Sequence, residues 1–130
     1  MKSAIAIVAA TIGLLAASPA MACRSSHSET HVFLPEMPRE IDENAIVLRV
    51  RPQQSVTAWN NGVLVDVVEV VRGEWTSATA FIDYGPFTSC SRVHLPAEGA
   101  LVIGMPREYA PTTLVAQQYR RRDWENDDGN

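Results

Sequence analysis

The feature that most restricts the fold of this chain is the spacing of its apolar residues between positions 45 and 119. They come in short runs rich in Val, Ile and Leu, and Gly, Pro, Asn or Asp stands between one run and the next. Runs of this length bounded by turn residues are typical of β-strands, whereas helix signals are scarce. We therefore expect five strands, over residues 45–51, 63–72, 79–84, 99–105 and 112–119.

The first two runs predict a β-hairpin. The first, AIVLRVR, is expected to continue past Pro52, a bend or edge position, through residues 56–59. The Asn-Asn-Gly sequence at residues 60–62 tolerates the left-handed backbone of a tight turn. Residues 63–72 (VLVDVVEVVR) should therefore return antiparallel to the first strand.

Two of the strands are expected to be irregular. Asp66 and Glu69 stand three positions apart, and strict two-residue alternation cannot place both on one face. A β-bulge or a strong local twist is therefore predicted between them. Gly104 marks a second bulge position in the fourth strand, and Pro111 stands at the start of the fifth.

Five strands are enough for a small closed barrel, and closure leaves no exposed sheet edge. At this size the five-stranded Greek-key barrel known as the OB-fold is the natural candidate. The predicted fold class is therefore all-β, with an irregular N-terminal segment before the barrel. A two-sheet sandwich is the alternative.

The N-terminus has the pattern of a signal peptide. Lys2 supplies a positive charge, residues 4–17 are almost wholly apolar, and small residues precede Cys23, so we expect residues 1–22 to be cleaved. The run is too short for a membrane-spanning helix, which needs about 20 apolar residues. The protein should then be periplasmic or secreted. A lipid anchor on Cys23 is the alternative, although Ala20 stands where lipoprotein processing prefers a large aliphatic residue.

Without the signal peptide, 108 residues remain, which suits one domain. We assign that domain to residues 23–119 and expect residues 120–130 to be a charged, frayed tail. Ten basic residues then face fifteen acidic ones, a net charge of about −5. This is the wrong sign for a nucleic-acid partner.

Both cysteines of the chain remain after cleavage. In an oxidising compartment an even pair more often forms a disulfide than two free thiols, so Cys23 is expected to bond to Cys90. Closing a loop of this length would contribute about 4 kcal/mol to stability.

Several segments, in order, resemble the netrin-like module, the family of OB-fold domains to which the tissue inhibitors of metalloproteinases belong. They are Cys23, AIVLRV at 45–50, VVEVVRGEW at 67–75, Ser89-Cys90 and GALVIG at 99–104. The resemblance spans residues 23–119 and implies a netrin-like OB-fold domain. In that family the first cysteine is joined to one in the loop before a glycine-plus-strand segment, which here corresponds to Cys23 and Cys90.

The resemblance also implies a mode of action. In the inhibitors, the α-amine and carbonyl of the N-terminal cysteine chelate a protease's catalytic zinc at its open position. Cys23 would then be the zinc ligand, Arg24 would enter the specificity pocket, and the cleft would be flanked by Thr88, Ser89 and Ser91. Ser25 stands where the inhibitors have a second cysteine, and Arg24 stands where they have a small residue. The fold can therefore be shared without the activity.

Two further groups of residues suggest binding sites. His27, Glu29 and His31 alternate along one extended segment, which would place them on one face as a site for Zn²⁺ or Cu²⁺; solvated side chains are the alternative. Most aromatic residues, Phe81 and Tyr109 included, should lie in the core, whereas Phe87 should be exposed in its turn and anchor a partner.

Catalysis is not expected, because a bridged cysteine is no nucleophile and the chain has neither a Gly-x-Ser-x-Gly nor a His-Glu-x-x-His motif. No cofactor is expected either. The sequence favours an exported, non-enzymatic module that binds an envelope or extracellular protein. The alternatives are a metalloprotease inhibitor acting through Cys23 and a periplasmic metal-binding protein.

Overall fold

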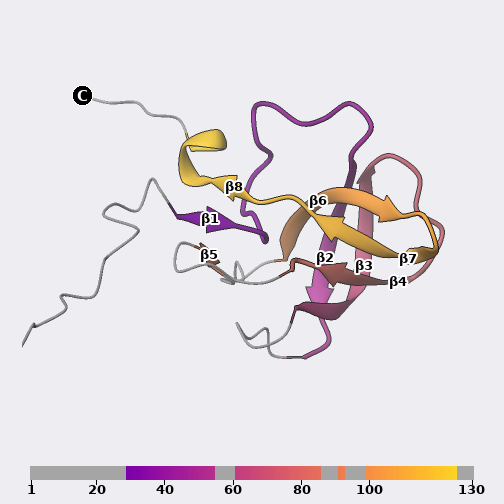
Figure 1. The fold of residues 1–130 in the computed structure, drawn as a ribbon. Helices are drawn as coiled ribbons and strands as arrows, with labels where there is room; N and C mark the ends of the chain where they lie inside the picture. Colours follow the sequence, from indigo (N-terminus) through magenta and orange to yellow (C-terminus); the bar gives the residue numbers. More distant parts are fainter. Residues whose placement is uncertain (1–28, 55–60, 86–90, 93–98, 126–130) are drawn as a thin grey trace, which may run out of the picture.

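The structure is a computed structural model that describes residues 29–54, 61–85, 91–92 and 99–125 (Figure 1). Several positions predicted from the sequence lie outside the described residues. They are the signal peptide, the strand continuation at 56–59, and Cys23, Arg24, His27, Phe87, Thr88, Ser89 and Cys90.

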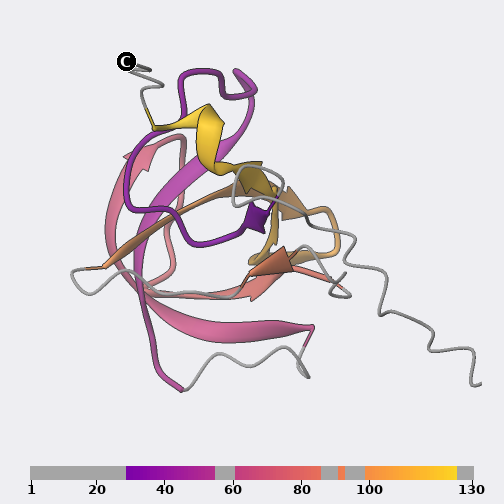
Figure 2. The same cartoon turned by 90° about the vertical axis from the view of Figure 1, so that its left-hand side faces the viewer.

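The predicted all-β fold is confirmed: five strands close into an OB-fold-like barrel (Figures 1 and 2). The strands are β2 (Ile46–Pro52), β3 (Gly62–Arg72), β4 (Thr79–Asp83), β6 (Ala100–Arg107) and β7 (Ala110–Ala116). Their order around the barrel is β2-β3-β4-β7-β6, and β6 pairs with β2 to close it. All pairs are antiparallel except β4–β7, which is parallel.

The barrel interior holds the main core, because alternate residues of each strand point inward. Leu48 and Val50 of β2 face Val65 of β3, Ile82 of β4 and Leu114 of β7, and all five are fully buried. Each such side chain contributes about 1.5–3 kcal/mol when it leaves water. The inward-facing residues of the apolar runs therefore form the main core of the fold.

The predicted bulge in the second strand is also confirmed. Arg49 pairs with Glu69, but the next residue, Val50, pairs with Val67, so β3 carries one extra residue between these pairs. The extra residue places both Asp66 and Glu69 at the surface. A second register shift follows near the end of β3.

The two glycines expected to shape turns or bulges serve another purpose. Gly62 and Gly104 both lie within strands and neither has a positive φ. A Cβ on Gly104 would stand 2.2 Å from the carbonyl oxygen of Val115, and one on Gly62 would stand 2.6 Å from that of Ile82. Both positions are therefore glycine because a neighbouring strand passes too close for a side chain. The irregularity in β6 lies instead between Pro106 and Arg107.

The N-terminal segment is more ordered than expected. Thr30–His31 forms β1, which pairs with β5 (Ser91–Arg92) on one side and β8 (Tyr119–Arg120) on the other. Three fully buried residues, Val32, Phe33 and Leu34, follow directly. The fifth predicted strand is likewise divided, because residues 117–118 separate β7 from β8.

Residues 120–125 also differ from the expected frayed tail. Arg120 completes β8, and the 3₁₀-helix η2 (Arg121–Asp123) follows it. Trp124 then packs against a second apolar cluster formed by Leu34, Ala45, Val47, Leu101 and Ile103. Among the described residues, no helix is long and apolar enough to cross a membrane.

Candidate functional site

The outer wall of the barrel has two unlike sides. Over β2 and β6, the second apolar cluster is covered by Ile41, Tyr119 and Trp124 from segments outside the barrel. The other side, formed by β3, β4, β7 and the end of β6, carries apolar residues that remain exposed. This uncovered side is the candidate site.

Four side chains define what we call the outer-wall patch: Leu64, Phe81, Met105 and Val115, each 38–40% exposed. They come from four different strands. Leu64 lies directly opposite Phe81 across β3–β4, and Met105 lies directly opposite Val115 across β6–β7. Residues directly opposite on paired strands have Cβ atoms about 4.5–5.5 Å apart, so each pair forms one continuous apolar surface.

The two pairs are joined by β4–β7. Phe81 lies beside Thr113 in this parallel pair, and Asp83 lies beside Val115 two residues later. Leu64, Phe81 and Thr113 therefore form one row across the wall, and Asp83, Val115 and Met105 form the next. Strand pairing fixes both rows, so the patch is built on the rigid part of the molecule.

The ring of Phe81 lies over Gly62. A Cβ built on Gly62 would lie 2.5 Å from the Cζ atom of Phe81, so the aromatic ring lies over the space where that side chain would be. An aromatic ring that covers a cross-strand glycine shields backbone that would otherwise be open to water. The ring therefore has a defined position while part of it remains exposed.

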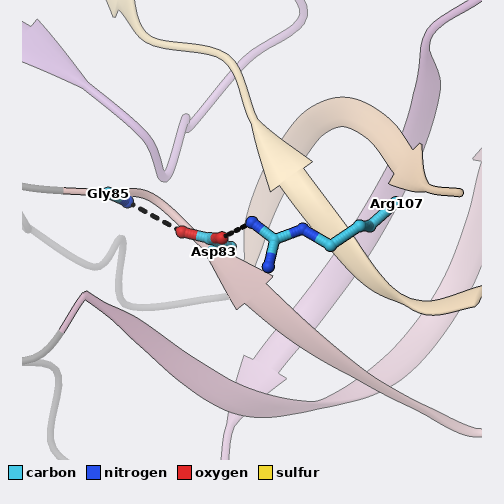
Figure 3. A network of polar contacts seen from close by, with 3 residues as sticks. All are labelled: Asp83, Gly85 and Arg107. Atoms are coloured by element: carbon cyan, nitrogen blue, oxygen red, sulfur yellow. Dashed lines mark hydrogen bonds and ion pairs between the residues drawn. The ribbon is translucent and has the colours of Figure 1, made fainter. Parts of the chain in front are cut away.

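An ion pair adjoins the patch (Figure 3). The carboxylate of Asp83 accepts a hydrogen bond from the guanidinium of Arg107 through Oδ2, and from the backbone N–H of Gly85 at 3.0 Å through Oδ1. The side chain of Asp83 is 18% exposed and that of Arg107 is 52% exposed. Both oxygens of Asp83 are thus satisfied within the chain, and the outer part of Arg107 faces solvent.

One further aromatic residue lies near this wall. Tyr109 occupies the two-residue turn between β6 and β7 and is 91% exposed. Phe81 and Tyr109 were both expected in the core, so that expectation was wrong for them. The strand register explains Phe81, because its neighbours Ala80 and Ile82 take the inward positions.

The other aromatic residues do lie in or against the core. Tyr84 is buried, its ring meets Phe33 edge to face with centroids 6.4 Å apart, and burial raises its pKa. Trp75 is half-buried against the main core and donates its indole N–H to the carbonyl oxygen of Thr79.

Few of the residues predicted to be functional fall within the described part of the chain. Ser91 lies in β5, where its backbone pairs in parallel with Thr30. Glu29 and His31 are half-buried near the same strands, and the ring of His31 meets Trp124 edge to face with centroids 5.2 Å apart. Within residues 29–54, 61–85, 91–92 and 99–125, no three His, Cys, Asp or Glu side chains are grouped as metal ligands.

Comparisons with known proteins add no further assignment. A scan against protein-family models, a search of curated proteins and a search of solved structures each found no match. Function is therefore inferred from the surface itself, which includes an apolar wall beside a satisfied ion pair on an OB-fold-like barrel.

Proposed function

We propose that the protein is an exported, non-enzymatic module that binds another protein through the outer-wall patch. The observation that carries this proposal is the contrast between the two sides of the barrel. One side buries its apolar residues under the protein's own chain, and the other leaves Leu64, Phe81, Met105 and Val115 about 40% exposed. Contiguous exposed apolar side chains of this kind mark interaction sites.

The energetics favour a partner of moderate affinity. Full burial of a large apolar side chain is worth about 1.5–3 kcal/mol, so covering the exposed part of each patch residue would contribute about 1 kcal/mol. The barrel strands already fix these side chains, and little conformational entropy is lost when a partner covers them.

The ion pair indicates the chemistry of that partner. Asp83 and Arg107 neutralise each other beside the patch, so the wall presents no net charge there. A partner should therefore place a neutral, apolar surface over the patch. Arg107, which is 52% exposed, would lie at the rim of this apolar contact, where its remaining N–H groups can donate hydrogen bonds to a carboxylate at the edge of the partner.

Photocrosslinking in the native host tests this proposal. A photoreactive phenylalanine analogue replaces Phe81 in one variant and Glu74, which is exposed but lies outside the patch, in a matched control. We expect an adduct with one defined protein at position 81, its loss when Val115→Glu is added, and none at position 74. Equal adducts at both positions, or one that survives Val115→Glu, would overturn the proposal. An adduct with a second copy of the chain would identify self-association instead.

A second function, metalloprotease inhibition, is favoured by a separate observation. The β1–β5 pair sets Thr30 beside Ser91, the residue that follows Cys90. Cys23 precedes Thr30 by seven residues, which can span up to about 25 Å, so the chain is long enough for the proposed Cys23–Cys90 disulfide. That bond would fix the N-terminal amine and carbonyl for chelation of a protease zinc.

The inhibitor function is tested by an insertion. The mature protein beginning at Cys23 is compared with one that carries an additional alanine before it, in assays against a panel of zinc metalloproteases. Inhibition by the first and not by the second is expected, because the alanine displaces the amine from the cysteine. Equal inhibition by both proteins, or by neither, would exclude this mode of action. The patch variants serve as controls, because they leave the N-terminus unchanged.

A further inference from the structure

A polar cleft lies away from the outer-wall patch, where residues 39–40 meet the C-terminal segment. Its volume is about 640 Å³, and it is lined by Arg39, Glu40, Gln118, Tyr119, Arg122 and Asp123. Figures 1 and 2 both show the connection between β1 and β2 beside β8 and η2. Both segments contribute lining residues to the cleft. Small-molecule sites have volumes of about 300–1,000 Å³, so the cleft has the size for a short ligand.

Backbone and side-chain hydrogen bonds hold the two sides of the cleft together. The N–H of Arg39 donates to the carbonyl oxygen of Asp123 at 2.9 Å, and its guanidinium donates to the carbonyl oxygen of Glu125. Asp123 in turn accepts the N–H of Arg120 through Oδ2 at 2.6 Å. Arg39 and Asp123 are therefore engaged in holding the fold, and the cleft exists before any ligand arrives.

Two charged groups in the cleft are not engaged in this way. Among the described residues, Glu40 makes no ion pair. The Nε atom of Arg122 lies 4.0 Å from Oδ1 of Asp123, too far for a hydrogen bond, and the side chain of Arg122 is 62% exposed. Glu40 comes from the connection before β2 and Arg122 from η2, so one negative and one positive group are available from different segments.

The lining of the cleft also includes a tyrosine of fixed orientation. Tyr119 packs against the second apolar cluster and donates its hydroxyl to Oε1 of Gln117 at 2.8 Å. Burial, followed by the nearby carboxylates of Asp123 and Asp42, raises its pKa, so the phenol is neutral at physiological pH. Tyr119 therefore adds an uncharged, partly apolar surface to the lining of the cleft.

These properties favour a ligand with both charges over a simple ion. A lone anion would meet the repulsion of Glu40 and Asp123 as well as the attraction of Arg39 and Arg122, and a lone cation would meet the reverse. A ligand that carries both charges satisfies each side. We propose that the cleft binds a short zwitterionic peptide, with its ammonium group at Glu40 and its carboxylate at Arg122. Arginine suits the second role, because its planar guanidinium can donate two parallel hydrogen bonds to a carboxylate.

The proposal is tested with alanine peptides of one to three residues, titrated into the mature protein and followed by NMR chemical shifts. Trialanine is then compared with its N-acetyl and C-amide derivatives. Each modification removes one charge and should weaken binding about two- to fivefold, the effect of an exposed ion pair. N-acetylation should have no further effect in Glu40→Gln, and C-amidation none in Arg122→Gln.

Two neighbouring residues provide matched controls. Arg121, on the same 3₁₀-turn, pairs with Glu125 and does not line the cleft, and Glu43 lies outside it. Arg121→Gln and Glu43→Gln should bind all three peptides as the unmodified protein does. The absence of shifts around Tyr119 at millimolar peptide, or derivative effects that persist in Glu40→Gln and Arg122→Gln, would overturn the proposal. Neither outcome bears on the outer-wall patch, which uses other residues.

Discussion

Replacing Gly104 with alanine should destabilise the barrel more than any other single-methyl addition at a described glycine. The new Cβ would lie 2.2 Å from the carbonyl oxygen and 2.8 Å from the carbonyl carbon of Val115, and 3.1 Å from Cα of Ala116. Carbon and carbonyl oxygen atoms in ordinary contact are about 3.3 Å apart, so β6 and β7 must separate by about 1 Å. All three neighbours are backbone atoms, and no side-chain rotation can relieve the clash.

The cost follows from overpacking. Added methylene groups in a packed interior cost about 1–3 kcal/mol where side chains can adjust, and we expect about 3 kcal/mol or more here. That is a large share of the total stability of a small domain, about 5–15 kcal/mol. Gly85→Ala is the matched control: no atom lies within 4 Å of its Cβ, but its φ of +65° costs a non-glycine residue about 1 kcal/mol.

Urea unfolding followed by tryptophan fluorescence measures both variants against the unmodified protein. The midpoint should fall markedly for Gly104→Ala and slightly for Gly85→Ala, and amide exchange should accelerate along β6 and β7 only in the first. A Gly104→Ala protein within about 1 kcal/mol of the unmodified one would refute the close approach of β7 to Gly104.

Three further predictions concern other parts of the molecule. Phe81→Ser should abolish binding of the proposed partner while lowering the free energy of unfolding by only about 1–2 kcal/mol, because the ring is already 40% exposed. Unchanged partner binding in a pulldown would contradict the assignment of binding to the outer-wall patch. Trp124→Ala should lower the free energy of unfolding in urea by about 2 kcal/mol and speed amide exchange in β1 and β8, because the indole packs on the second apolar cluster and contacts the ring of His31. Unchanged exchange would show that the C-terminal segment contributes no stability. The free energy of unfolding should fall above about pH 10, because the raised pKa of Tyr84 keeps its hydroxyl protonated in the folded state after the unfolded chain has begun to lose that proton. In denaturant unfolding, Tyr84→Phe should show a smaller fall over the same pH range. An equal fall would exclude Tyr84 as its cause.

The local sequence pattern predicted the barrel strands well. It could not predict the features that depend on which distant strands lie side by side. The short apolar runs bounded by turn residues identified the five strands, and the spacing of Asp66 and Glu69 identified the bulge. The reason for glycine at position 104 is the carbonyl group of Val115, which no local reading of the sequence reveals.

The candidate sites depend even more on long-range arrangement. Phe81 is an aromatic residue of the kind found in cores. It lies on the outer wall of the barrel only because its neighbours Ala80 and Ile82 take the inward positions of the strand. The cleft joins Glu40 to Arg122, eighty-two positions later, through the backbone bond between Arg39 and Asp123. Without the paired strands, the sequence gives no reason to bring these residues together.

The parallel contact between β4 and β7 also determines when the barrel can close. Ile82 pairs with Leu114, thirty-two positions later, and Val47 pairs with Ile103, fifty-six positions later. The β2-β3-β4 meander and β6, which pairs with β2, therefore keep two open edges, on β4 and on β6, until β7 inserts between them. Contacts of such sequence separation form more slowly than local ones, so the nascent chain should expose strand edges with unpaired backbone N–H and C=O groups until both contacts have formed. Dependence on a holding chaperone would then be a direct result of topology rather than of low final stability.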